Sequence, residues 1–262
     1  MSVAIMKNTG SGIENDPHFE ARCDLAAVFR WTARMDMHEA VVNHFSYAVS
    51  DDGSQFLVNP NGRHFSRIRA SELLLVDAND DETLSRADAP EPTAWYIHGA
   101  MHRNVSHARC ILHLHPRYAT VLASLADSTL PPIDQNTMRF YGRTVVDDGF
   151  DGLGLGDEAE RLTRQVQDCP IIIMGNHGVM AVAQNIALAQ NIALAFDDLY
   201  YFERACENYI LALQTGKRLR IATDEVAQKT SEQWQGYVQE LADAHLREIR
   251  EILDREEPDY RQ

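Results

Sequence analysis

The chain has 262 residues, 45% of them hydrophobic, and it carries 24 Lys and Arg against 39 Asp and Glu, a formal net charge of −15. A chain of this length and composition can bury a sizeable core, which excludes an intrinsically disordered protein. The acidic balance argues against a protein that binds nucleic acid or an anionic membrane surface, because both need a basic face.

The cysteine pattern and the lack of a long apolar run predict a cytoplasmic protein. The cysteines are far apart and form no CxxC pair: Cys23, Cys110, Cys169 and Cys206. They are expected to be reduced, buried thiols. Residues 1–18 contain no apolar stretch typical of a signal peptide and are expected to form a polar N-terminal arm. The most apolar stretch, 169–196, contains Gly and Gln-Asn interruptions, whereas a membrane span needs ~20 uninterrupted apolar residues.

The first half of the chain predicts a helix, a hairpin and a further strand and helix. Apolar residues recur at helical spacing over 19–34, which predicts an amphipathic helix. Two alternating runs, 44–49 and 55–58, flank Ser-Asp-Asp-Gly-Ser and predict a β-hairpin. The other predicted elements of this half are a strand over 73–76, a polar loop over 78–91 and a helix over 93–103.

The second half of the chain alternates strands and helices. A strand over 109–115 is stopped by Pro116. The elements predicted next are a helix over 119–125, a strand over 144–146, a helix over 157–167, a strand over 170–174 and a long helix from about 185 to 214. A C-terminal helix carries one apolar stripe: Trp234, Val238, Leu241, Ile249 and Leu253. Since no linker interrupts this mixture, one α/β domain over residues 19–262 is favoured over two.

A perfect tandem hexamer, Ala-Gln-Asn-Ile-Ala-Leu, fills residues 183–188 and again 189–194. Six residues rotate a helix face by about 240°, so an added copy changes the helical register. The favoured interpretation is that one copy extends the start of the long helix or the loop before it. The alternative is an extension of a subunit contact.

Two histidines at the end of a predicted strand are the most informative feature of the sequence. Because side chains alternate along a strand, His113 and His115 face the same side. Neutral imidazoles in this position are suited to share a cation, although two surface histidines would have the same spacing. His177 follows the next predicted strand between glycines, in what is expected to be a tight strand-to-helix turn. Three histidines from two strand ends predict a metal site with open positions, with zinc expected and manganese or iron as alternatives.

A second histidine pair lies on the helix predicted over 93–103. His98 and His102 are four residues apart and therefore share a helix face. No Glu follows His98, so the zinc-peptidase pattern is absent. We expect this pair to pack in the core or to support the metal site.

The order of five motifs resembles the class II aldolase/adducin family over about residues 19–213. The motifs are Asn43-His44-Phe45-Ser46, the segment 56–62, His113-Leu114-His115, the segment 135–143 and the segment 175–179. The resemblance implies a three-layer α/β/α sandwich around a mixed, mostly antiparallel sheet. It also implies a homo-oligomer, commonly a tetramer, with active sites near subunit contacts. Within it, His113, His115 and His177 match the metal ligands, and Asn43 and Ser46 match the loop that holds the anionic end of the substrate.

The chain departs from the sugar-phosphate aldolases of that family at three positions. Ala94 stands where those enzymes have an acid/base Glu. Pro92-Thr93 replaces a Ser-Ser pair that touches phosphate, which leaves Thr93 as the candidate substrate contact. Gln135 replaces a tyrosine and is a further candidate contact. The pattern is closer to the adducin-like branch of the family.

Three neutral imidazoles would leave the charge of a divalent metal uncompensated, so the site is expected to bind a small anionic substrate such as a hydroxy acid, a keto acid or a sugar-acid derivative. A metal can act as a Lewis acid on a developing enolate, which is common to aldol cleavage and decarboxylation. The expected activity is therefore that of a metal-dependent lyase. The candidates to replace the missing Glu are His98, Tyr96, Tyr141 and Asp134.

Two other functions remain open at this stage. The same three histidines could hold Fe(II) in an oxygenase that uses O₂. An adducin-like binding or assembly module without catalysis is the non-enzymatic alternative. The presence of all three histidines weighs against that module, because adducin-type proteins lack them.

Overall fold

The computed structural model describes residues 12–149, 151–166, 169–183 and 191–262, and its centre is a seven-stranded sheet. The strands, in chain order, are β1 (His44–Ala48), β2 (Gln55–Val58), β3 (Leu74–Asp77), β4 (Cys110–Leu114), β5 (Thr144–Asp147), β6 (Ile171–Met174) and β7 (Gly178–Ala183). Their order across the sheet is β3-β2-β1-β4-β7-β6-β5. Among the strands of the described residues, only β5 and β6 pair in parallel, so the sheet is mixed and mostly antiparallel.

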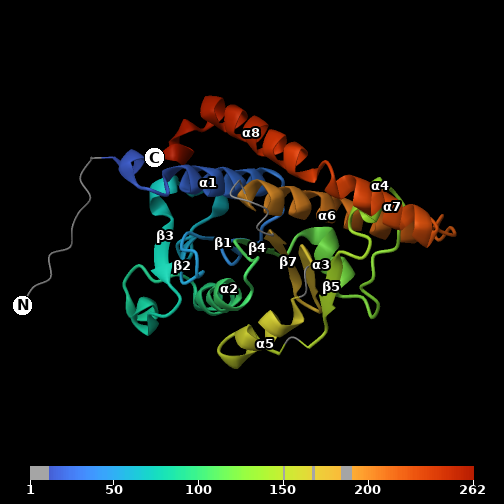
Figure 1. The fold of residues 1–262 in the computed structure, drawn as a ribbon, viewed down its shortest axis with the longest axis horizontal. Helices are drawn as coiled ribbons and strands as arrows, with labels where there is room; N and C mark the ends of the chain where they lie inside the picture. The colour runs from blue at the N-terminus through green and yellow to red at the C-terminus, as the bar shows by residue number, and fades with distance from the viewer. Residues whose placement is uncertain (1–11, 150, 167–168, 184–190) are drawn as a thin grey trace, which may run out of the picture.

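Helices cover both faces of the sheet and complete three layers (Figure 1). One face carries α1 (Phe19–Arg34) and α6 (Asn191–Gln214), with α8 (Val238–Glu256) packed outside them. The other face carries α2 (Pro92–Asn104) and α5 (Asp157–Gln165). The shorter helices are α3 (Arg117–Ala123), α4 (Gln135–Arg139) and α7 (Asp224–Gln235). The predicted α/β/α sandwich is confirmed. In the part of the chain described, no helix combines the length and apolar character needed to cross a bilayer.

The alternation of side chains explains why both faces of the sheet are apolar. Along β6, Ile171 and Ile173 join the core beneath α1 and α6, whereas Ile172 and Met174 join the core beneath α2 and α5. Such near-continuous apolar runs are typical of strands covered on both faces. Along β4, Leu112 belongs to the first core, so His113 projects toward the α2 side. This alternation decides on which face the polar site is built.

Several sequence expectations about individual elements are wrong. The segment 175–177 does not lead into a helix but into β7, which pairs antiparallel with β6. Consecutive apolar residues after a glycine fit either element, and only the pairing with β4 identifies a strand. The predicted C-terminal helix is two helices, α7 and α8, separated at Gly236 and Tyr237. Leu241, expected on the buried stripe, is 46% exposed.

Short 3₁₀ helices lie in the predicted polar arm, in the predicted polar loop and in stretches for which no element was predicted. They are η1 (Ile13–Asn15), η2 (Phe65–Arg67), η3 (Ala70–Glu72), η4 (Asp81–Ser85) and η5 (Pro258–Arg261). Most of the arm predicted over 1–18 lies outside the described residues, as do residues 184–190 of the tandem hexamer. The effect of the repeated copy on the helix therefore stays a prediction.

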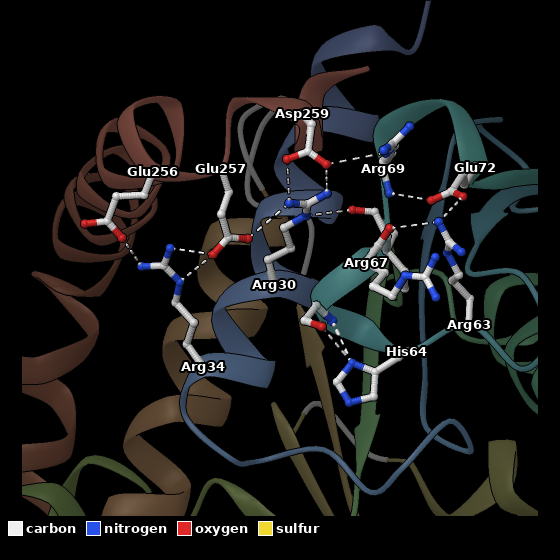
Figure 2. Close-up of polar contacts among 12 residues, drawn as sticks. Arg30, Arg34, Arg63, His64, Arg67, Arg69, Glu72, Glu256, Glu257 and Asp259 are labelled. Atoms are coloured by element: carbon white, nitrogen blue, oxygen red, sulfur yellow. Dashed lines mark hydrogen bonds and ion pairs between the residues drawn. The ribbon is translucent and has the colours of Figure 1, made fainter.

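An ion-pair network fastens η5 and the end of α8 to α1 and to the segment 63–72 (Figure 2). The Arg30 guanidinium binds both Glu257 and Asp259 at 2.8–3.0 Å, and Arg34 binds Glu257. Tyr260 is fully buried beside this network. The C-terminal helices thereby close over the outer side of α1.

A second ionic cluster is entirely buried between α4 and α6. Arg139 is 0% exposed and donates to Asp197 at 2.8 Å and to Asp198 at 2.7 Å. Its guanidinium carbon lies 4.6 Å from the Tyr201 ring centroid and 5.4 Å from that of Trp234. With the Phe140 ring at 5.6 Å, two carboxylates and three aromatic rings thus surround one arginine.

Candidate metal centre

Three histidines meet where β4 ends and β6 turns into β7, on the side of α2. His113 is in β4, His115 follows β4 directly, and His177 is in the turn between β6 and β7. Their potential ligand atoms all lie within 4.8 Å of one another. The ring centroids are 4.7–5.0 Å apart. The structure therefore brings together the three residues expected to be metal ligands.

The turn and the strand that follows it explain how His177 reaches the other two rings. Asn176 has a φ of 57°, a left-handed conformation that Asn tolerates better than most residues. Gly178 lies against the end of β4, and a Cβ there would be 2.5 Å from His115 Cδ2 and 2.6 Å from the Leu114 carbonyl oxygen. A glycine is required because β7 approaches the His115 ring this closely.

Hydrogen bonds on the far side of two rings fix where their lone pairs point. His113 Nδ1 lies 3.1 Å from the Val179 carbonyl oxygen, and His115 Nδ1 lies 2.6 Å from Glu39 Oε2. Both partners can only accept, so both Nδ1 atoms carry the proton and both Nε2 atoms carry a lone pair. These two Nε2 atoms face each other at 3.2 Å. When both rings are neutral, neither Nε2 carries a proton that it could donate to the other. A cation bound between them would accept both lone pairs.

The spacing of the two nitrogens fits one divalent ion. Two imidazole nitrogens bound at about 2.1 Å to the same ion lie about 3.0 Å apart in octahedral and about 3.4 Å apart in tetrahedral geometry. The observed 3.2 Å falls between these values. His113, His115 and His177 can therefore hold a metal, and three protein ligands would leave positions open for a substrate.

Burial keeps two of these imidazoles neutral. It lowers the pKa of His113 well below the ordinary value, and the neighbouring His44 and His177 rings lower it further. Burial also lowers the pKa of His177 to about 4, with a further contribution from His115 and an opposing one from Glu39. Neutral imidazole is the form that binds a metal, so these two ligands are ready to bind at neutral pH.

A chain of hydrogen-bonded histidines runs beside the cluster. His102 Nδ1 donates to the Ala108 carbonyl oxygen at 2.6 Å, so its Nε2 accepts from the Ser46 hydroxyl at 2.7 Å. The Ser46 oxygen in turn accepts from His98 Nδ1, and His98 Nε2 accepts from His44 Nδ1 at 2.7 Å. His44 pairs with His113 across β1 and β4. The Ala108 carbonyl thus sets the tautomers of His102, His98 and His44, which are all neutral.

Thr93 and Glu91 lie beyond His44, at the other end of this series of hydrogen bonds. The Thr93 hydroxyl donates to the Glu91 carboxylate and lies 3.3 Å from His44 Nε2. Asn43, the residue before β1, is buried, and its Oδ1 accepts from the Glu39 backbone N–H at 2.5 Å. Its Nδ2 has no hydrogen-bond partner among the described residues. Ser46, Thr93, His98 and Asn43 thus all belong to the surroundings of the cluster.

The other candidate residues are held by different parts of the fold. Asp134 caps α4 and accepts from Asn208 in α6 at 2.6 Å. Gln135 is exposed and lines a shallow apolar groove with Trp234. The Tyr141 hydroxyl is hydrogen-bonded to Asp224 at the start of α7, which raises its pKa. Tyr96 packs edge-on against Trp95 in α2. Their catalytic or substrate-binding roles stay predictions.

Two functional candidates were missed by sequence reasoning. Glu39 lies in the loop between α1 and β1, 76 residues from its partner His115, and no spacing rule connects them. His44 could have been found, because it alternates with Ser46 on a strand expected to lie in a buried sheet. The structure shows that its ring centroid is 4.9 Å from that of His113.

The buried, hydrogen-bonded histidines predict how the free energy of unfolding depends on pH. Burial lowers the pKa of His102 to about 4, against the ordinary value of 6.5, while its bond to Ala108 opposes the shift. The unfolded chain therefore binds more protons between about pH 6.5 and 4, and the free energy of unfolding decreases as the pH falls through this window. One such group contributes about 3 kcal/mol over the whole window.

Urea unfolding of the metal-free protein between pH 7.5 and pH 4.5 checks this prediction. The variant His102→Gln keeps a donor for the Ala108 oxygen but has no group to titrate, so its stability should depend less on pH. The variant His18→Gln, which alters a histidine before α1 that makes no side-chain cap bond, serves as the control. An unchanged slope for His102→Gln would contradict the assignment.

The fold and this site define an α/β/α sandwich protein with three convergent histidines at one sheet edge. The chain belongs to the class II aldolase and adducin family: the family model described as Class II Aldolase and Adducin N-terminal domain matches residues 23–210. The predicted family is thereby confirmed.

Relatives and solved structures agree with this membership. A putative aldolase class 2 protein of Caulobacter vibrioides is 28% identical over 83% of this chain and 82% of its own length. The decarboxylase NovR of Streptomyces niveus is 28% identical over 79% of this chain and 75% of its own. The crystal structure of an aldolase II superfamily protein from Pseudomonas syringae is 29% identical, with a TM-score of 0.80 over 94% of this chain and 96% of that one.

Proposed function

We propose that this protein is a divalent-metal-dependent carbon–carbon lyase that acts on a small hydroxy acid, keto acid or sugar-acid derivative. The observation that carries the proposal is the pair of Nε2 lone pairs of His113 and His115, which face each other at 3.2 Å with His177 beside them. The relative named a decarboxylase adds support, since decarboxylation is one of the two reactions considered.

The donor set favours an anionic substrate. Among the described residues, the cluster consists of three imidazoles and contains no carboxylate. A divalent metal bound there would supply Lewis-acid stabilisation of negative charge that develops on a substrate oxygen. Since neutral ligands leave the positive charge of the ion intact, a chelating carboxylate of the substrate would compensate it. Zinc is the metal we propose, with manganese or iron as alternatives.

The surrounding residues would orient the substrate and its proton transfers. The buried Asn43 amide has a donor available for a substrate oxygen, because its own oxygen is engaged by the Glu39 backbone. The Thr93 hydroxyl lies beside His44 on the α2 side of the sheet, whereas the buried Ser46 hydroxyl is already engaged by His98 and His102. We propose His98 as the residue nearest to an acid/base role, since it is linked to the cluster through His44. Decarboxylation would need no base for its first step.

An anaerobic assay tests this function. The protein is loaded with zinc, manganese or iron and offered a panel of small hydroxy acids, keto acids and phosphorylated sugar acids. We expect release of CO₂ or of an aldehyde from at least one compound, loss of turnover with a chelator, and recovery when metal returns. Turnover that requires both iron and O₂ would instead identify an oxygenase. Failure to bind one equivalent of any of these metals would favour an adducin-like binding module and overturn the proposal.

A further inference from the structure

We infer that Glu39 is a positioning residue of the metal centre, which fixes the tautomer of His115 and thereby sets metal affinity; this inference rests on the proposed metal site. The contact that carries it is the 2.6 Å hydrogen bond from His115 Nδ1 to Glu39 Oε2. If Nδ1 carries the proton, Nε2 presents its lone pair to the cluster. Carboxylates that accept from metal-bound imidazoles orient the ring and raise its basicity.

His115 depends on this side chain more than its neighbour does. His113 Nδ1 donates to the backbone oxygen of Val179, which no substitution of a side chain removes. His113 is also 2% exposed, so its ring is held by packing. The His115 side chain is 20% exposed and lies beyond the end of β4, where Glu39 is the acceptor for its Nδ1. Without Glu39, the proton of His115 could occupy either ring nitrogen.

The loop that carries Glu39 is held in one conformation at several points. Asp36 and Ala40 have φ values of 53° and 46°, a region that costs free energy for residues other than glycine. The Asn43 side chain accepts from the Glu39 backbone N–H. Such a conformation persists only where surrounding contacts determine it. The carboxylate is therefore placed by the fold rather than reaching His115 by chance.

The neighbouring residue anchors the same loop to a different segment. His38 Nε2 lies 2.9 Å from His64 Nε2, and the His38 ring stacks on Phe65 with a centroid distance of 5.3 Å. His64 belongs to the segment whose arginines meet Glu72 and Asp259 in Figure 2. Glu39 is thus held from both sides, by His38 before it and by Asn43 after it.

The experiment measures zinc affinity and uses three variants. In Glu39→Ala the acceptor is lost, and in Glu39→Gln the amide oxygen still accepts from Nδ1 without the charge. Asp36→Asn is the matched control, because it removes an exposed carboxylate from the same loop and Asn tolerates the positive φ of this position. Dissociation constants are obtained by competition with a chromophoric chelator, with zinc alone as the probe.

We expect Glu39→Ala to weaken zinc binding about tenfold. This is the lower end of the range of about 10–100-fold for such outer contacts, chosen because the Glu39 side chain is 60% exposed. Glu39→Gln should recover part of the loss, and Asp36→Asn should bind like the unaltered protein. Equal affinities for Glu39→Ala and the unaltered protein, or an equal loss in Glu39→Ala and Asp36→Asn, would overturn the inference.

A second measurement separates this inference from the proposed function. The ¹⁵N chemical shifts of His115 in the metal-free protein report its tautomer. We expect a proton on Nδ1 in the unaltered protein and a mixture of tautomers in Glu39→Ala. A proton on Nε2 in the unaltered protein would overturn the role of Glu39 even if zinc binds. Failure of the unaltered protein to bind zinc, with the expected tautomers observed, would overturn the proposed function instead.

Discussion

Replacement of His115 by alanine is expected to abolish stoichiometric metal binding and metal-dependent turnover while leaving the fold intact. Two imidazole ligands remain in the variant. The apparent binding free energy of a four-ligand zinc site is about 10–16 kcal/mol. Divided equally among the ligands, this gives about 3 kcal/mol for the lost imidazole, or about 100-fold in affinity. The fold should survive because His115 lies beyond the end of β4 and its side chain is 20% exposed.

Metal analysis after dialysis and a thermal unfolding curve of the metal-free protein check both halves of this prediction. His18→Ala is the control, since His18 precedes α1 and makes no side-chain cap bond. The unfolding temperature of metal-free His115→Ala should stay close to that of the unaltered protein. A variant that keeps one equivalent of metal and full turnover would show that the active centre is elsewhere.

Arg139→Ala is expected to have the largest effect on stability. Removing one partner of a buried ion pair costs about 3–5 kcal/mol, because the remaining charge stays buried without compensation. Here two carboxylates are left, Asp197 and Asp198, each about 1% exposed, although Asp197 keeps its contact with His245 at 2.9 Å. Burial already raises the pKa of Asp198, and the positive charge of Arg139 is the largest influence that lowers it. Much of a typical total stability of about 5–15 kcal/mol would be lost.

Urea unfolding at pH 7 measures this loss. Arg139→Lys should also destabilise the protein, because an ammonium group cannot bind two carboxylates as a planar fork. The control is Arg86→Ala, whose partner Asp88 is exposed on the surface, so the change should cost less than about 1 kcal/mol. A loss of similar size in Arg139→Ala and Arg86→Ala would mean that the buried cluster is not needed for stability.

Local patterns in the sequence were sufficient for much of the fold. The helix expected over 19–34 and the strand expected over 55–58 have these bounds in the structure, because apolar periodicity coincides with burial there. The apolar run of β7 has no periodicity that distinguishes a strand from a helix. Its pairing with β4 and β6 identifies it as a strand. The C-terminal stripe continued across Gly236 in the sequence, although the helix is interrupted there.

In the candidate site too, local sequence patterns identified some residues, whereas contacts between distant segments could not be predicted. His113 and His115 are two residues apart on one strand, so their shared direction follows from geometry alone. His177 was found through the glycines beside it, although the turn they form leads to a strand. Glu39 has no such signal, since its loop meets His115 only through the placement of α1 over the sheet. Contacts between distant segments are what a single sequence leaves open.

The close approach of β7 to β4 limits how this protein can be engineered. Because even a methyl group at position 178 would collide with the imidazole of His115 and with the carbonyl of Leu114, that position offers no freedom for redesign. Randomising its codon would yield glycine alone among functional clones. Substitutions meant to alter the site are better placed at the start of α2, where the Thr93 hydroxyl lies 3.3 Å from His44 Nε2.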